Sequence, residues 1–227
     1  MQLFWTPASP FTRKVCVAAR ELGLWEQIEI KPTTWTLDWG YTTPRFTPGL
    51  AEANPVARIP TLVTDAGVPL GDSTIICLHL NEVAAPRSLI PAEPVARQWM
   101  WSIYAVADGA LEAQIAMRAE FLRPDATRSE SFLEKQRVRI RRCFDALERD
   151  VAHLEGPINL GQITAGIALG YQDWREWLED FRPGRPRLAA WYERFAELPS
   201  MTATEPRETP TATTAFSSPP TKSRSST

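Results

Sequence analysis

The stretch QLFWTPASPFTRKVCVAARELGLWEQIEIKP, residues 2–32, holds three elements in close succession. It begins with a short apolar run, continues with a helical pattern and ends with residues 26–32, which alternate in the manner of a strand. The helical part carries apolar residues three or four positions apart: Val15, Ala18, Ala19 and Leu22. Gly23 then offers a helix stop. The stretch therefore predicts a β-α-β unit.

A second set of elements follows after a long connection. Residues 59–70 read as two short strands around a turn at residues 65–67, where glycine tolerates a positive φ. A helix is predicted from Ser73 to Val83. The order β-α-β, connection, β-β-α predicts a four-stranded mixed sheet with helices packed on it, the α/β part of the fold, over residues 1–83.

Proline marks the end of this first unit. Three prolines in the stretch AAPRSLIPAEP, residues 84–94, disfavour a helix and predict a linker over residues 84–92. Strand patterns then disappear, and long helical patterns cover residues 95–122 and 128–154, with shorter ones starting near Leu160 and Arg187. We expect an all-α domain, a helical bundle, over residues 93–208, and a disordered low-complexity tail over residues 209–227.

Composition excludes several classes of partner. The net charge of −2 leaves no positive excess that would attract nucleic acid or anionic lipid. Cys16, Cys77 and Cys143 lie far apart, so we expect neither a disulfide framework nor a metal site. No segment approaches eighteen uninterrupted apolar residues. These features indicate a cytoplasmic protein that binds no nucleic acid and no membrane.

Three short motifs each have a purely structural explanation. Serine and proline at Ser9 and Pro10 suit a helix cap and a first helical turn. Pro60 stands before a predicted strand, where an edge or a turn explains it. Asp72 or Ser73 would cap the next helix. None of these motifs alone decides whether a ligand is also bound.

A fourth motif has a structural role whether or not the protein binds a ligand. In the stretch INLGQITAG, Asn159 can cap a helix while Gln162, three residues later, reaches back to the cap's own N–H group. This arrangement predicts a capping box at the start of a helix near Leu160.

Together the four stretches resemble the glutathione S-transferase family, over residues 1 to about 208. The resemblance is carried by SPFTRKV from Ser9, NPVARIPTLV from Asn54, GDSTIICLHL from Gly71 and INLGQITAGIALGYQDWR from Ile158, in the order and spacing typical of the family. It implies a thioredoxin-like N-terminal domain, an all-helical C-terminal domain, glutathione as co-substrate and a homodimer. It also implies a detoxifying transferase that acts on a small hydrophobic electrophile.

Roles for the motifs follow from this resemblance. It implies that Ser9 is catalytic and donates its hydroxyl to the glutathione sulfur, which favours the thiolate. Lowering a thiol pKa by about two units needs about 2.7 kcal/mol, which one hydrogen bond to an anion and a helix N-terminus can supply together. The implied glutathione-binding residues are Phe11, Arg58, Ile59, Pro60, Asp72 and Ser73.

Each binding residue has its own implied contact. Ile59 pairs its main chain with the cysteinyl backbone of glutathione, Ser73 binds the γ-glutamyl carboxylate, and Asp72 stands near the ammonium. Arg58 is either a helper near the peptide or a solvated surface residue.

The electrophile pocket is the least determined part. Trp35 and Trp39, in an aromatic-rich segment over residues 33–53, either border the pocket or pack that segment onto its own domain. On the predicted helix 95–122, Trp101, Tyr104 and Asp108 recur three or four residues apart, so one face can meet the cleft between the domains.

Other activities stay open at this point. A non-catalytic member of the superfamily would bind glutathione or a protein partner without turnover. A specialised glutathione-dependent isomerase, dehalogenase or ether-cleaving enzyme is a third possibility. A redox role for Cys16 is disfavoured, because this residue lies about two turns into the first helix among apolar neighbours.

Overall fold

The computed structural model describes residues 1–33 and 47–208. The N-terminal part contains β1 (Gln2–Trp5), α1 (Pro10–Glu21), η1 (Trp25–Gln27), β2 (Glu29–Pro32), α2 (Leu50–Ala53), β3 (Thr61–Val63), β4 (Pro69–Gly71) and α3 (Ser73–Val83). The C-terminal part contains α4 (Pro94–Phe121), η2 (Asp125–Thr127), α5 (Glu130–Arg149), η3 (Val151–Leu154), α6 (Leu160–Trp174), α7 (Pro186–Ala196) and α8 (Pro199–Thr202). The expected tail at residues 209–227 lies outside the described residues.

The sheet has four strands in the order β2-β1-β3-β4. Strand β1 pairs parallel with β2 and antiparallel with β3, and β3 pairs antiparallel with β4. The central position of β1 buries Leu3 and Phe4 completely or nearly so. The predicted four-stranded mixed sheet and the α/β plus all-α architecture are therefore confirmed.

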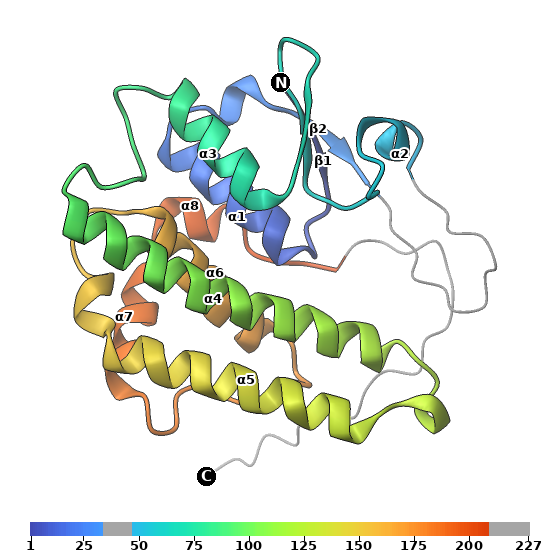
Figure 1. Ribbon diagram of the computed structural model, residues 1–227, viewed down its shortest axis with the longest axis vertical. Coiled ribbons are helices and arrows are strands. Elements are labelled where there is room, and N and C mark those ends of the chain that lie inside the picture. The colour runs from blue at the N-terminus through green and yellow to red at the C-terminus, as the bar shows by residue number, and fades with distance from the viewer. Residues whose placement is uncertain (34–46, 209–227) are drawn as a thin grey trace.

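Helices α1 and α3 lie side by side between the sheet and the helical part of the molecule (Figure 1). Helix α1 also contacts α6 and α8, so it is covered on several sides. Every residue from Thr12 to Ala19 is buried, including the charged Arg13 and Lys14. This position makes α1 the element through which the two parts of the chain meet.

Helix α6 forms the centre of the helical part. All its residues from Leu160 to Gln172 are buried. The predicted capping box is confirmed, since Asn159 Oδ1 accepts from the Gln162 amide at 3.1 Å and Gln162 Oε1 accepts from the Asn159 amide at 2.8 Å. A side chain at Gly161 would place its Cβ 2.7 Å from the Met100 carbonyl oxygen, so α4 and α6 approach closely here.

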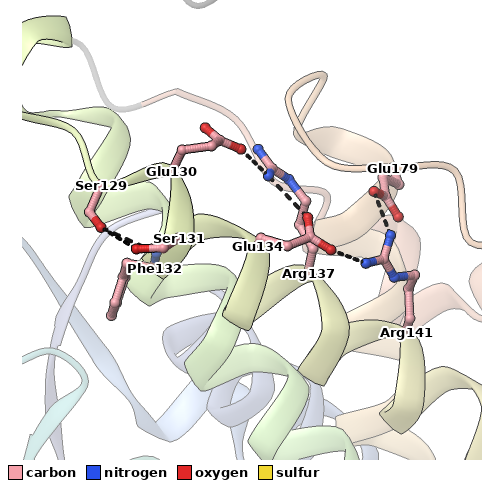
Figure 2. Close-up of polar contacts among 8 residues, drawn as sticks. All are labelled: Ser129, Glu130, Ser131, Phe132, Glu134, Arg137, Arg141 and Glu179. Atoms are coloured by element: carbon pink, nitrogen blue, oxygen red, sulfur yellow. Dashed lines mark hydrogen bonds and ion pairs between the residues drawn. The ribbon is translucent and has the colours of Figure 1, made fainter.

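Helix α5 presents a charged face to solvent (Figure 2). Ser129 caps its start, and ion pairs then follow along the exposed surface. They join Arg137 to Glu130 and Glu134, and Arg141 to Glu134 and Glu179. Exposed pairs of this kind contribute about 0–1 kcal/mol each, so this face adds little to stability.

The predicted single helix over residues 128–154 is wrong at its C-terminal end. Helix α5 stops at Arg149, Asp150 leaves helical geometry with φ −98° and ψ 16°, and η3 follows. In η3, Val151 and Leu154 are buried in the core of the helical part. Burial of these two side chains, a tertiary effect, overrides the helical pattern of the sequence.

No helix in residues 1–33 and 47–208 has the length and apolar character needed to cross a membrane. In the same residues, no three or more His, Cys, Asp or Glu side chains are grouped so that they could hold a metal ion.

Candidate active site

A cavity of about 740 Å³ lies where the N-terminal part meets α4. It is bordered by the loop that leads into α1, the turn before β3, the start of α3 and the middle of α4. Eight of the residues that the sequence singles out line it together: Ser9, Phe11, Arg58, Ile59, Pro60, Asp72, Ser73 and Asp108. The fold thus gathers residues from positions 9 to 108 around one space.

Ser9 is the N-cap of α1, and its hydroxyl keeps one free function. Its backbone is extended, and Ser9 Oγ accepts a hydrogen bond from the Thr12 amide at 3.2 Å. Pro10 has no N–H group, and the Phe11 amide has no partner among the described residues. The hydroxyl hydrogen of Ser9 therefore remains available to an acceptor in the cavity, beside the positive end of the helix dipole.

The turn before β3 presents main-chain groups to the cavity. The Ile59–Pro60 peptide bond is cis. Neither the amide nor the carbonyl of Ile59 forms a hydrogen bond to a residue that the structure describes. Side-chain bonds hold the turn in place, because Thr61 Oγ1 donates to the Arg58 carbonyl at 2.7 Å and Asn54 Nδ2 donates to Thr61 Oγ1 at 2.9 Å.

The start of α3 is the second helix N-terminus at the cavity. Asp72 has a positive φ of 68°, and its Oδ1 accepts from the Thr74 amide at 2.7 Å. Partial burial alone would raise the pKa of Asp72, but hydrogen bonds from Thr74 and the positive charge of Lys14 outweigh burial and lower that pKa. Asp72 is therefore a carboxylate at neutral pH, next to the Ser73 amide, which α3 itself does not satisfy.

A buried lysine ties the two helix starts to α4. Lys14 Nζ lies 2.7 Å from Tyr104 Oη and 2.7 Å from Asp108 Oδ1. Tyr104 Oη lies 2.7 Å from Thr74 Oγ1, in the first turn of α3. The Lys14 side chain is fully buried, whereas that of Asp108 is 25% exposed and reaches the cavity. The chain of contacts from Thr74 to Asp108 thus holds α1, α3 and α4 in one arrangement.

The charge of Lys14 is stable in this environment. Burial alone would lower its pKa, but the negative potential of Tyr104 and Asp108 outweighs burial and raises the pKa above its usual value. Sequence analysis missed this residue. No local signal marks it, because the neighbouring Arg13 is charged as well and the burial of Lys14 depends on Tyr104 and Asp108 of α4.

The two aromatic residues of α4 that were expected at the electrophile pocket lie elsewhere. Trp101 and Tyr104 do not line the cavity, because Trp101 packs edge-on against Tyr104 and the Tyr104 hydroxyl bonds Lys14 and Thr74. Trp35 and Trp39 lie outside the described residues. The wall that α4 provides is formed instead by side chains that sequence analysis did not single out, besides Asp108: Glu112, Ile115, Ala116, Arg118 and Ala119.

The thiols of the chain are poor nucleophiles. Burial raises the pKa of Cys16 and of Cys77 to about 12. Cys143 is half-buried on α5, and burial raises its pKa as well. None of the three cysteines lines this cavity, so a thiolate that reacts there must come from a ligand.

The chain is similar to several known proteins. The model of the glutathione S-transferase N-terminal domain matches residues 3–88. An uncharacterized GST-like protein of Escherichia coli K12, YibF, is 30% identical over 209 residues, which is 91% of this chain and 98% of that protein.

Solved structures extend the similarity. A glutathione transferase family member from Pseudomonas fluorescens Pf-5 with bound glutathione is 34% identical, with a TM-score of 0.84 over 91% of this chain and 99% of that one. A structure from the same organism holds S-(propanoic acid)-glutathione and is 33% identical, with a TM-score of 0.81 over 92% and 100%. A glutathione S-transferase from Methylobacterium radiotolerans, in complex with glutathione sulfonate, is 25% identical with a TM-score of 0.80 over 95% and 99%.

Proposed function

The chain belongs to the glutathione S-transferase family, and from that premise we propose that it joins the sulfur of glutathione to an electrophilic carbon of a small second substrate. Ser9 stabilises the thiolate, and the start of α3 binds the γ-glutamyl end of the tripeptide. The observation that carries the proposal is that Ser9, Ile59 and Ser73 line one cavity.

The contacts of glutathione follow from the groups left free at this cavity. The Ser9 hydroxyl donates to the sulfur while its oxygen still accepts from the Thr12 amide. The free amide and carbonyl of Ile59 pair with the cysteinyl backbone, as a neighbouring strand would. The Ser73 amide and hydroxyl bind the γ-glutamyl carboxylate at a helix N-terminus, and the Asp72 carboxylate attracts the ammonium.

Asp108 has a supporting part in this arrangement. One of its oxygens is bonded to Lys14, and its partly exposed side chain faces the cavity from α4. Lys14 keeps this carboxylate oriented and offsets its charge, so that the cavity does not repel the sulfur anion.

The chemical step needs no general base from this chain. The bound thiol releases its proton to solvent, because the hydrogen bond from Ser9 and the start of α1 favour the anion. The sulfur electron pair then forms a carbon–sulfur bond, and the leaving group departs with the electron pair of the bond that breaks.

A titration and a turnover assay test the proposal together. We expect calorimetry of the full chain with glutathione to show one site, and a model aryl chloride to be conjugated. Ser9→Ala should lower turnover about 10- to 100-fold, the loss expected for one hydrogen bond to an anion, with little change in glutathione affinity. Absence of binding heat would contradict the glutathione site, and unchanged turnover would remove Ser9 from the mechanism.

The family premise also leads us to propose a homodimer in a reducing, cytoplasmic setting. The dimer is supported by exposed aliphatic side chains on neighbouring elements of the chain. Ile75 and Val83 on α3 are 48% and 47% exposed, and Val95 at the start of α4 is 57% exposed. All three cysteines are also unpaired. Light scattering after size-exclusion chromatography should give the mass of two chains. A mass of one chain would contradict the dimer.

A further inference from the structure

The wall that α4 contributes to the cavity changes character along the helix. Asp108 and Glu112 give it carboxylates at one end, and Ile115, Ala116 and Ala119 form a small apolar stretch after them. Arg118 is the only cation that α4 adds to this wall. Ten residues of helix separate Asp108 from Arg118, which is about 15 Å along the axis. The α4 wall of the cavity therefore has an acidic end and a basic end on opposite sides of an apolar middle.

The acidic part is largely neutralised within the protein. Asp108 is paired with the fully buried Lys14. Glu112 is exposed, so that solvent screens its charge. Carboxylates on α4 therefore impose little net negative potential on the far side of the cavity.

Arg118 has no such compensation. It is half-buried, and its guanidinium forms no hydrogen bond and no ion pair to any residue in the described part of the chain. Other half-buried arginines of the helical part are bonded: Arg97 to main-chain carbonyls, and Arg123, Arg128, Arg137, Arg141 and Arg182 to carboxylates. Among the described residues of the helical part, Arg118 is thus the half-buried arginine whose guanidinium is free to bind a ligand.

The surroundings of Arg118 do not supply an anion either. Burial raises the pKa of Tyr171, and the positive charges of Arg175 and Arg118 both oppose this rise, so the two guanidinium groups lie near the same phenol. Glu208 pairs with Arg175. Glu208 is therefore already paired, and the Arg118 guanidinium keeps its positive charge without a carboxylate partner.

We propose that the electrophile carries a carboxylate and that Arg118 binds it. This inference rests on the proposed function and names its substrate class. The sulfur of glutathione lies at Ser9, the apolar stretch of Ile115, Ala116 and Ala119 contacts the carbon skeleton of the electrophile, and the guanidinium pairs with its anionic end. The proposal narrows the sequence-based expectation of a small hydrophobic electrophile to one that also carries an anionic group.

Two matched ligands test this without depending on turnover. S-(4-carboxybenzyl)glutathione and S-(4-methylbenzyl)glutathione share the tripeptide and the ring and differ in one charged group. By calorimetry on the full chain, we expect the carboxylated ligand to bind about tenfold more tightly, the gain expected for a charge-assisted hydrogen bond. In Arg118→Met the ratio of the two affinities should fall to about one, whereas Arg118→Lys should keep part of the preference.

Controls separate this pair from other effects. Arg139→Met removes an exposed arginine of α5 that does not line the cavity, and it should leave the tenfold preference unchanged. Circular dichroism checks the folding of each variant, and Arg118→Gln serves as a second neutral variant. Glutathione itself should bind wild type and Arg118→Met equally, because Arg118 contacts the electrophile and not the tripeptide.

Each outcome bears on a different claim. If wild type binds neither ligand, the glutathione site is wrong and the inference falls with it. If the methylbenzyl ligand binds and the carboxylated one has no advantage, only the inference is overturned. It is also overturned if Arg118→Met keeps the preference, or if this variant loses affinity for glutathione as strongly, since Arg118 would then hold a carboxylate of glutathione itself.

Discussion

Helices α1 and α5 begin in the same way and end up with different roles. Ser9 Oγ accepts from the Thr12 amide at 3.2 Å, and Ser129 Oγ accepts from the Phe132 amide at the same distance. Ser9 lines the cavity, whereas Ser129 lies on the solvent face of α5 (Figure 2). An identical cap therefore serves stability in one place, and in the other it is also available to a ligand.

The residues that follow each cap differ as well. Five positions after Ser9 comes Lys14, whose side chain is fully buried against Tyr104 and Asp108. Five positions after Ser129 comes Glu134, whose side chain is 51% exposed and paired with arginines. The start of α1 is thus held by a buried polar network and the start of α5 by solvated ion pairs.

Of all substitutions at the two helix starts, replacing Lys14 should lower the free energy of unfolding the most. Lys14→Met leaves the Asp108 carboxylate without its buried partner, so the free energy of unfolding should fall by about 3–5 kcal/mol. Glu134→Gln, the matched change on α5, should cost less than about 1 kcal/mol. Urea unfolding of both variants measures the difference.

A second change checks the cause of that loss. If the unpaired carboxylate is responsible, adding Asp108→Asn to Lys14→Met should restore part of the stability. A double variant less stable than Lys14→Met would contradict the account of a buried charge pair.

Removing each serine cap is expected to separate stability from turnover. Ser9→Ala and Ser129→Ala should each lower the free energy of unfolding by about 1 kcal/mol, since each loses one capping hydrogen bond. Turnover should fall about 10- to 100-fold in Ser9→Ala alone, which corresponds to about 1.5–3 kcal/mol. Equal losses of turnover in the two variants would show that the effect comes from stability.

The buried cysteines of α1 and α3 should make the stability of the protein fall at alkaline pH. Burial raises the pKa of Cys16 and Cys77 to about 12, from 9.0 in the unfolded chain. Between these pH values the unfolded state binds fewer protons, so the free energy of unfolding should fall as pH rises, by about 1.4 kcal/mol per pH unit for each thiol. Denaturation at several pH values between 9 and 12 measures the slope, and Cys16→Ala should reduce it.

Thiol labelling at neutral pH should distinguish the two buried cysteines from the half-buried one. In the native protein, an aromatic disulfide reagent should modify the half-buried Cys143 first. Cys16 and Cys77 should react at the rate of unfolding. Prompt modification of all three thiols would contradict their burial.

The smallest effect is expected at a third helix start. Asn159→Ala removes the side chain that caps α6. The Gln162 side chain, the other half of the capping box, stays anchored because it also donates to the Leu154 carbonyl at 2.8 Å. The free energy of unfolding should fall by about 1 kcal/mol, and turnover of the folded protein should not change. A loss of turnover would mean that α6, too, influences the cavity.

Much of the fold could be predicted because its signals are local. Apolar spacing and the proline-rich segment between them place the predicted helices 73–83 and 95–122 within a residue of α3 (Ser73–Val83) and α4 (Pro94–Phe121). The break at Asp150 could not be predicted, because burial of Val151 and Leu154 against other helices decides it.

The candidate site was predicted in part. Its N-terminal residues stand in short motifs, whereas Lys14 and Arg118 carry no motif. Their roles depend on how closely α4 approaches α1 and α6, which no local pattern records.

By itself, the sequence determined the order of the main elements and the helix caps at Ser9 and Asn159. A cap needs only a side chain and an amide three residues later, so a short stretch specifies it. Only the tertiary structure decided which cap borders a cavity, that a lysine of α1 is buried against Tyr104 and Asp108, and that Arg118 faces the cavity unpaired. Those features depend on packing between segments far apart in the chain, where side-chain shape and charge from several helices act together.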